Sequence, residues 1–483
     1  MTPNMIKHTT IYKYLLIVIL FISVNACKVP SMLPAPELKT IPNGYKNLSI
    51  VDSANIVKIK WNQFFTDQQL IALIDTALIQ NLDVLTTLQE IEIAKNKVKL
   101  ANGKFVPTIN GGVNLAVEKV GRYTSQGAGD ASADITPGNT VPELLPSINF
   151  GFQASWEADI WGKLKNEKQA AYLRYLSTEA GKNLVITNLI AEIAFNYYEL
   201  LAQTNQLEIV RKSIELQSNE LEIVKVQKEA GVVTSLAVKQ FEAQLYNTQN
   251  LEFNILQNIV ETENKINLLL GRYPQKITVD TKNILQTTPS IIKAGVPSQL
   301  LINRPDIKQA ELELQASNFD IIAARAEFYP SLNIGSTFGF SAFKPSYLLR
   351  TPESIMYSMA SDITGPIVNK SAIKAAFANV NALQIEAMYT YQRSIFNGFI
   401  DVSNQLSNLE NLTKAHDLKL KEAIALTEAV DVSNDLFKYG KANYLEVMIA
   451  QKEALNTQLE LIDVKKQKLQ ALTNIYKALG GGW

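Results

Sequence analysis

The chain has 483 residues, with 46 basic and 46 acidic side chains, two histidines and one cysteine. Hydrophobic residues make up 47% of it, so there is enough apolar surface for a core, which excludes wholesale disorder. The balanced charge argues against a nucleic-acid-binding protein, whose binding surface needs a basic excess, and so few histidines and cysteines exclude a metal site rich in these ligands.

Residues 1–26 are predicted to form a lipoprotein signal peptide. Lys7 and Lys13 give this segment a positive start, and the apolar run Tyr14–Ile22 follows. The run is the longest in the chain and is shorter than the ~20 residues of a membrane-spanning helix, so a polytopic helical membrane protein is also excluded. The alternative for this segment is a short buried helix.

Cys27, the only cysteine, ends a Val-Asn-Ala-Cys segment that resembles the lipobox of bacterial lipoproteins. In a lipobox the cysteine is lipidated and becomes the mature N-terminus, so the resemblance implies an anchor in membrane lipid. Lys28 stands where lipoproteins retained in the inner membrane often carry Asp, which favours the outer membrane. Residues 27–60 are then predicted to be the lipidated N-terminus and an extended tether, because four prolines fall between Lys28 and Asn55.

Four segments alternate between apolar and polar residues with the period of a β-strand. They are Ile109–Val117, Ile148–Ala158, Leu332–Ser341 and Ile355–Ile363. Each has about the 9 to 11 residues of a tilted membrane strand. The soluble alternative is two hairpins packed on a domain core. The segment Val120–Pro146, rich in Gly, Ser, Asp and Pro, is predicted to be a loop between the first two strands.

A membrane sheet built from four strands cannot close by itself. No strand edge can stay unpaired in a bilayer, and a spanning barrel needs at least about eight strands. If the four segments span a membrane, the protein must therefore oligomerise. A dimer would supply eight strands with a filled interior, and a trimer twelve, which begins to open a pore.

Two proline-free stretches predict very long helices, because proline breaks a helix. Lys163–Ala230 has 68 residues and Ile367–Tyr439 has 73, and at 1.5 Å per residue the first allows a helix of roughly 100 Å. Each stretch ends at a glycine and is followed by a second, shorter helical stretch, Val232–Leu270 or Lys441–Leu479, and these two are equal in length. Two helical hairpins of matching size are predicted.

The first long helix carries two apolar seams with heptad spacing. The first seam consists of Leu207, Val210, Ile214, Gln217, Leu221 and Val224, and the second of Ile209, Leu216 and Ile223. Two seams on one helix predict neighbours on both sides. The alternative is a two-helix coiled coil or stalk.

Repeated motifs indicate a tandem duplication. Phe105–Asn110 recurs as Phe328–Asn333, at an offset of 223. Gly231 recurs as Gly440, at an offset of 209, and Leu270-Gly271 recurs as Leu479-Gly480 at the same offset. We therefore divide the chain into a first structural repeat at 61–271, an equatorial linker at 272–302 and a second structural repeat at 303–483.

Short motifs along nearly the whole mature chain resemble those of the TolC-like outer membrane factors, in particular the lipoprotein branch of RND-type efflux pumps. They are Phe64–Asp67, Trp156–Lys163, Leu268–Arg272, Gly295–Leu301, Asn303–Ile307 and Ala478–Trp483. The resemblance implies a mainly α protein with a membrane β-barrel. In this fold a homotrimer forms a 12-stranded barrel in the outer membrane, with four strands from each protomer, and a long α-helical barrel crosses the periplasm.

We expect a passive channel and no enzyme. The chain has no phosphate-binding loop, metalloprotease helix or nucleophile elbow, and Ser371–Lys374 matches the start of a penicillin-binding signature without its companion motifs. No cofactor, catalytic residue or metal ligand is predicted. The resemblance implies the exit duct of a tripartite efflux system for drugs or other small molecules, working with an inner-membrane RND-type transporter and a periplasmic adaptor. The alternatives are a channel for type I protein secretion and a non-conducting periplasmic coiled-coil scaffold.

The turns of the two helical hairpins are the predicted adaptor-contact tips. The residues assigned to them are Gly231, Val232, Thr234, Ser235, Gly440, Lys441, Asn443 and Tyr444. The glycines suit left-handed turn conformations. The alternative is an ordinary helix turn without a partner.

Glu446 is the predicted gate residue. In the family, an acidic ring near the constriction at the tip helps to gate the pore and favours cations. Three carboxylates facing one axis attract cations in the manner of charged filter rings. The sequence departs from the family pattern at Ile449 and Ala237, where a second acidic residue could stand. A solvated surface role for Glu446 is the alternative.

Overall fold

The structure is a computed structural model. It describes residues 30–32, 34, 36, 37, 39–42, 44, 45, 60–279, 297–365 and 371–482. The predicted signal peptide at 1–26, the lipidation site Cys27, most of the tether and residues 280–296 of the linker lie outside the described residues. The chain divides into two compact units. We call the described parts of Ile93–Tyr175 and Glu313–Met388 the strand unit, and those of Glu37–Glu92, Leu176–Leu312 and Tyr389–Trp483 the hairpin unit.

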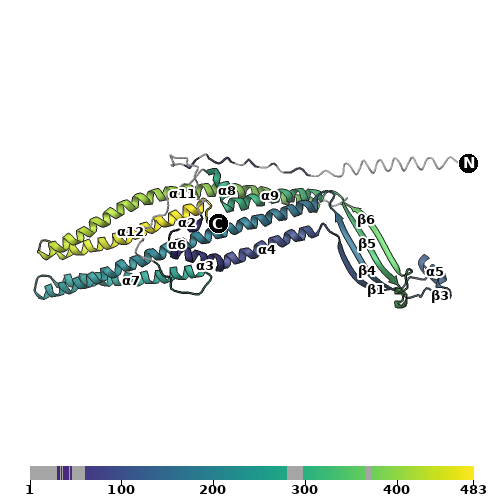
Figure 1. The fold of residues 1–483 in the computed structure, drawn as a ribbon, viewed down its shortest axis with the longest axis horizontal. Helices are drawn as coiled ribbons and strands as arrows, with labels where there is room; N and C mark the ends of the chain where they lie inside the picture. Colours follow the sequence, from purple (N-terminus) through teal and green to yellow (C-terminus); the bar gives the residue numbers. More distant parts are fainter. Residues whose placement is uncertain are drawn as a thin grey trace. The chain divides into compact units, whose positions relative to one another are not determined.

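The strand unit contains one antiparallel four-stranded sheet (Figure 1). Its strands are β1 (Thr108–Glu118), β4 (Leu145–Ala158), β5 (Ser331–Ala342) and β6 (Ile355–Thr364), in the order β1-β4-β5-β6. All four predicted strands are confirmed. Helices α4 (Leu82–Gly103) and α9 (Pro305–Ala326) precede β1 and β5 in the chain, and the single-turn helix α10 (Pro345–Leu348) joins β5 to β6.

The segment between β1 and β4 has more structure than the predicted loop. It forms α5 (Ser125–Ser132) and a small sheet of β2 (Asp134–Thr136) with β3 (Asn139–Thr140). The reason is local hydrogen bonding between side chains and backbone: the Thr124 hydroxyl accepts a bond from the Gly127 amide at 3.1 Å, which caps α5. The Asp134 carboxylate accepts one from the amide of Gly138, a residue with φ of +79°.

Two helical hairpins of matching length are present, as predicted (Figure 1). The first is α6 (Lys163–Glu229, 67 residues) with α7 (Ser235–Leu269, 35 residues). The second is α11 (Ser371–Lys438, 68 residues) with α12 (Tyr444–Ala478, 35 residues). The first seam of α6 is buried, with Val210 at 0% and Leu221 at 6% exposure. In the second seam, Ile209 packs against the core, whereas Leu216 and Ile223 are 63% and 56% exposed. This side of α6 therefore lacks a neighbour at Leu216 and Ile223 within the described part of a single chain.

The main apolar core lies in the hairpin unit. Short elements contribute side chains to this core or lie next to it. They are α2 (Trp61–Phe64), α3 (Gln68–Gln80), η3 (Pro297–Gln299) and α8 (Leu300–Asn303). Phe64 stacks on Tyr476 with ring centroids 4.2 Å apart, and Leu70 and Ile74 of α3 are fully buried. Burying each such side chain contributes roughly 1.5–3 kcal/mol.

Two helical stretches within the described residues, Gln68–Gly103 and Lys163–Glu229, are long and apolar enough to cross a membrane by length and composition. This is weak evidence for membrane helices, since core helices pass the same test. In α6, 56% of the most apolar window is buried within the protein, and charged residues such as Glu208 and Lys212 form an exposed ion pair on its surface. We therefore assign the α6 stretch to protein packing.

Candidate functional site

The four-stranded sheet has one apolar and one polar face. Its register pairs Phe150 with Val113 of β1 on one side and with Phe340 of β5 on the other, and Phe340 pairs with Ile355 of β6. Alternation then sets the whole apolar face, which carries Ile109, Val113, Leu115, Val117, Ile148, Phe150, Phe152, Ala154, Trp156, Leu332, Ile334, Phe338, Phe340, Ile355, Tyr357, Met359 and Ile363. The opposite face carries mostly Asn, Gln, Ser, Thr and Gly.

The apolar face is not covered by other described elements of the strand unit. Val113 is 62% exposed, Phe152 is 57% exposed and Met359 is 79% exposed. The polar face is joined across strands by side-chain hydrogen bonds, such as that from Ser341 Oγ to Asn149 Oδ1 at 2.7 Å and that between Thr337 and Ser358. An apolar face of this size in a monomer marks a contact surface for lipid or protein. The soluble alternative, in which this face packs on a domain core, is not what the structure shows for the described residues.

Both edges of the sheet are open. Among the described residues β1 pairs only with β4, and β6 pairs only with β5. Each edge is about ten residues long and unprotected by the shortening or proline that blunts exposed edges in soluble proteins. The sheet is therefore built to continue into further strands.

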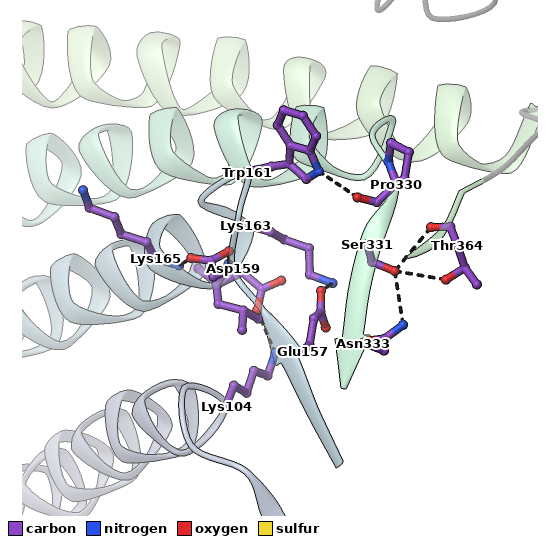
Figure 2. A network of polar contacts seen from close by, with 12 residues as sticks. Lys104, Glu157, Asp159, Trp161, Lys163, Lys165, Pro330, Ser331, Asn333 and Thr364 are labelled. Atoms are coloured by element: carbon purple, nitrogen blue, oxygen red, sulfur yellow. Dashed lines mark hydrogen bonds and ion pairs between the residues drawn. The ribbon is translucent and has the colours of Figure 1, made fainter. Parts of the chain in front are cut away.

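Two tryptophans of the Trp156–Lys163 segment fasten the corners where helices lead into strands. The indole of Trp156 donates to the carbonyl of Phe105 at 3.0 Å. The indole of Trp161 donates to the carbonyl of Pro330 at 2.7 Å (Figure 2). Trp161 also stacks on Tyr329 at 4.8 Å. The two carbonyls belong to the repeated Phe-x-Pro motif. One segment, from the end of β4 to the start of α6, therefore holds the equivalent corner in both repeats.

Ion pairs surround this junction. Lys163 contacts Glu157 at 2.9 Å, and Lys104 contacts Glu167 at 2.7 Å, while Asp159 caps α6 by accepting from the amide of Lys165 at 2.8 Å (Figure 2). Burial opposes charge on Lys163, but the hydrogen bond and charge of Glu157 outweigh it, so the pKa of Lys163 is raised. Tryptophan and lysine together at the end of a sheet are typical of a membrane–water boundary.

The two hairpin turns have the same backbone geometry. Gly231 and Gly440 have φ of +75° and +70°, and in each turn the next residue's amide bonds back to the carbonyl five positions earlier, as in a Schellman motif. Of the predicted tip residues, seven are exposed and Tyr444 is half-buried, so the structure places them together at each turn with free surface. Val232 is 70% exposed, an apolar side chain available to a partner.

Glu446, the predicted gate residue, has a local structural role. Its carboxylate accepts a hydrogen bond from the Asn443 amide at 2.9 Å, and the Asn443 side chain accepts from the Glu446 amide, which completes a capping box for α12. The side chain of Glu446 is also exposed. Ala237, the equivalent residue of the first repeat, is fully buried, and Thr234 makes no side-chain cap.

Arg304 makes a contact that the sequence did not reveal. Its guanidinium donates to Asp306 at 2.7 and 3.0 Å, to Asp401 at 3.3 Å and to the carbonyl of Ala478 at 2.8 Å. Burial disfavours the charge, but the bonds and charges of Asp306 and Asp401 outweigh it and raise the pKa of Arg304. It thereby ties the start of α9 to α11 and to the end of α12.

The first repeat makes the equivalent tie with an uncharged residue. Asn81 donates from its side chain to the carbonyl of Leu269 at 2.9 Å and caps α4 by accepting from the amides of Asp83 and Val84. The offsets between the repeats, 223 before the strands and 209 after them, relate Asn81 to Arg304 and Leu269 to Ala478. The duplication was visible in the sequence, and aligning its two copies could have found this pair.

Among the described residues no group of three or more His, Cys, Asp or Glu side chains is arranged to hold a metal ion. The perturbed pKa values of acidic and basic groups outside the strands trace to structural ion pairs and burial, as with Lys163 and Arg304. The described residues therefore support a structural role, in which the sheet separates two environments and the hairpin turns offer a contact surface.

The sequence matches the family described as outer membrane efflux protein over residues 73–272 and 296–481. It is 27% identical to the cation efflux system protein CusC of Escherichia coli strain K12, with 94% of each chain covered. It is 26% identical to the pyoverdine export outer membrane protein OpmQ of Pseudomonas aeruginosa, covering 88% of this chain and 87% of that one. The probable outer membrane lipoprotein SilC of Salmonella typhimurium is 27% identical, over 88% of both chains.

A crystal structure of CusC has the same fold. It superposes with a TM-score of 0.80 at 25% identity and covers 93% of this chain and 99% of that one. For CusC, conformational changes are described that accompany folding and transmembrane channel formation. The predicted family resemblance and the predicted fold class are both confirmed.

Proposed function

This chain belongs to the outer membrane efflux protein family, and we propose that it forms the outer membrane exit duct of a tripartite efflux system. It is not an enzyme, and the relatives whose names describe efflux or export from the outer membrane favour this function over type I protein secretion and over a scaffold without a pore. Conduction would be passive, because the chain carries no energy-coupling motif.

The observation that carries the proposal is the sheet with two chemically different faces and two open edges. The polar face would be stable in contact with water and the apolar face in contact with lipid. A strand in the wall of a membrane channel has these two environments. Four strands cannot close, whereas three copies supply twelve strands around a water-filled lumen. We therefore propose a homotrimer.

The partners follow from the hairpin turns and the N-terminus. We assign contact with a periplasmic adaptor to the turns, where Val232 and the exposed residues around Gly231 and Gly440 offer free surface. An inner-membrane RND-type transporter would supply the energy. Cys27 would be lipidated and hold the N-terminus in outer membrane lipid, in keeping with the lipoprotein name of SilC.

The transported compounds are proposed to be drugs or other small molecules. The names of the relatives span cations and pyoverdine, so likeness to this family does not select one compound. A wall lined mostly by neutral polar groups, such as Asn149, Gln153 and Ser341, suits many solutes, and selection would then reside in the pump.

Glu446 remains our proposed gate residue, and its capping role makes the choice of variant important. Glu446→Gln keeps a residue that can complete the capping box but removes the charge, while Glu446→Ala removes both. If a ring of three carboxylates favours cations, both variants should lower the cation-to-anion permeability ratio in single-channel recordings. If selectivity is unchanged in Glu446→Gln and circular dichroism shows that the helix is intact, Glu446 caps α12 and has no role in gating.

Two measurements test the duct itself. Native mass spectrometry of the detergent-solubilised, lipidated protein should give three copies, and the same preparation should give ion current in planar bilayers. A folded monomer or dimer, or a trimer that produces no current, would overturn the proposal.

A further inference from the structure

The two open edges of the sheet carry enough information to predict how they meet. On the proposed trimer, β6 of one copy lies beside β1 of the next, and the pair is antiparallel because neighbouring strands alternate in direction. We infer the register of this seam between copies: Ala360 of one copy lies opposite Ala116 of its neighbour. The inference rests on the proposed trimer and goes beyond it by specifying the paired residues.

The two β-hairpins of the chain are equivalent residue by residue. Motifs at the start of the first strands have an offset of 223, and motifs after the second strands have an offset of 209. Once the first strands are related by 223, the strand pairing gives 209 for the second strands, the same value as the helix motifs. Gly112 lies opposite Gly151 in the first hairpin, and adding 223 and 209 to their numbers gives Gly335 and Ala360, which lie opposite each other in the second.

The junction between the two hairpins then serves as a template for the junction between copies. Inside one chain, β4 ends the first hairpin and β5 begins the second, with Gly151 opposite Gly339. In a ring of six equivalent hairpins, β6 must meet the next β1 as β4 meets β5. The position equivalent to Gly151 is Ala360, and the position equivalent to Gly339 is Ala116.

This register satisfies the two faces of the sheet without further adjustment. On the apolar face it places Ile363 opposite Val113 and Met359 opposite Val117. On the polar face it places Asp362 opposite Asn114 and Ser358 opposite Glu118. A shift by one residue would set apolar side chains against polar ones on both faces, so only shifts by even numbers compete.

The size of the residues distinguishes the inferred register from the shifts by two residues. Gly151 and Gly339 approach so closely that a Cβ added to Gly151 would lie 2.6 Å from the Cα of Gly339. Neither strand has room for a Cβ at this pair, so the equivalent position favours the smallest side chains, and the inferred register supplies Ala360 and Ala116. Shifting by two residues would place Ala116 opposite Ser358 or Asp362 instead. The two methyl groups also require this seam to be set slightly wider than β4 and β5.

The seam fixes the stagger of the barrel. Crossing the strands from Asn110 leads to Gln153, then to Thr337, then to Ser358, and then to Glu118 of the next copy. Each copy therefore advances the pairing by eight residues along β1, from 110 to 118. A large stagger gives strongly tilted strands and a wider barrel for the same strand number.

Disulfide trapping tests the register directly. The double variant Ala116→Cys with Ala360→Cys, oxidised with diamide in outer membranes, should form covalent dimers and trimers on non-reducing gels. In a non-hydrogen-bonded antiparallel pair, the Cα atoms of directly opposed residues lie about 4.5 Å apart, a distance that a disulfide can span. Diagonal neighbours lie about 7–8 Å apart. We expect about ten-fold more covalent product than from Ala116→Cys combined with Ser358→Cys or Asp362→Cys.

Controls separate failure of the register from failure of the trimer. Asn149→Cys with Ser341→Cys, opposed within one chain, should oxidise without linking copies and shows that the reagent reaches the sheet. Single-cysteine variants measure background. Stronger linking by a displaced pair, or no linking by 116 with 360 in a protein that is still trimeric by native mass, would overturn the register while leaving the duct intact. A monomeric mass with no linking would instead overturn the duct.

Discussion

The two helical hairpins have the same lengths and the same turns but differently filled seams. In the first hairpin, Phe241 and Leu245 of α7 are 4% and 7% exposed and form a cluster with Leu221 and Val224 of α6. Their counterparts in α12, at the offset of 209, are Ala450 and Ala454. The backbone of the repeat was kept while the apolar volume between its helices was reduced.

The difference extends to charge. Leu207 and Val210, both buried in the first seam, correspond to His416 and Lys419 in the second hairpin. Lys419 forms ion pairs with Glu422 at 2.7 Å and with Glu460 of α12 at 2.8 Å. Exposed ion pairs contribute far less than buried apolar side chains, so we expect the second hairpin to open more readily than the first.

Phe241→Ala should remove most of the difference between the hairpins. Loss of the buried ring is expected to lower the free energy of local opening of α6 and α7 by about 3–5 kcal/mol, because it leaves a cavity in the first seam. Native-state hydrogen exchange of α7 amides measures this. Asn247→Ala, an exposed position on the same helix, is the control and should change the value by less than about 0.5 kcal/mol. Equal effects of the two variants would contradict the assignment of the seam's stability to Phe241.

Arg304→Ala and Asn81→Ala compare the ties at the base of the two hairpins. Removing Arg304 leaves Asp306 with its main charge partner missing and the Ala478 carbonyl without its bond, so we expect a loss of about 3 kcal/mol. Removing Asn81 costs a neutral hydrogen bond and a helix cap, or about 1–2 kcal/mol. Urea unfolding of the detergent-solubilised protein orders the two variants. A larger effect for Asn81→Ala would reverse the comparison.

Gly231→Ala and Gly440→Ala test what the hairpins share. Both glycines have positive φ, where a side chain costs about 1–2 kcal/mol, and no atom lies within 4 Å of the added Cβ in either turn. The two substitutions should therefore lower stability by similar amounts, measured by hydrogen exchange of the flanking helix ends. Gly44→Ala, at a position with the same open space but without a positive φ, should be neutral. Unequal losses would show that the turns are not equivalent.

His416→Leu should give the smallest effect, and one that depends on pH. Burial lowers the pKa of His416, with Lys465 and Lys468 adding to the shift and Asp417 partly opposing it. The unfolded chain therefore binds a proton below about pH 6.5 that the folded chain does not, and stability falls as the pH falls through this window. His416→Leu should reduce the difference in Tm between pH 7.5 and pH 5.5. An unchanged difference would show that His416 does not contribute.

Much of the fold was predictable because its signals are local. The alternation of apolar and polar residues over Ile148–Ala158 predicted β4, and the glycines at 231 and 440 predicted the two hairpin turns. The small sheet of β2 and β3 was missed, because it depends on a few side-chain bonds to the backbone in a segment of turn-forming composition. The capping role of Glu446 was available in principle, since Asn443 stands three residues before it.

The sequence by itself determined the elements of this protein: the strands, the paired long helices, their duplication and the incompleteness of four strands. These follow from periodicity and from residues that restrict the backbone. Only the tertiary structure decided which distant groups meet, as when Arg304 reaches the end of α12 or Trp161 reaches Pro330. It also decided which seam of α6 is filled and how the strands are registered, because these depend on packing between segments that lie far apart in the chain.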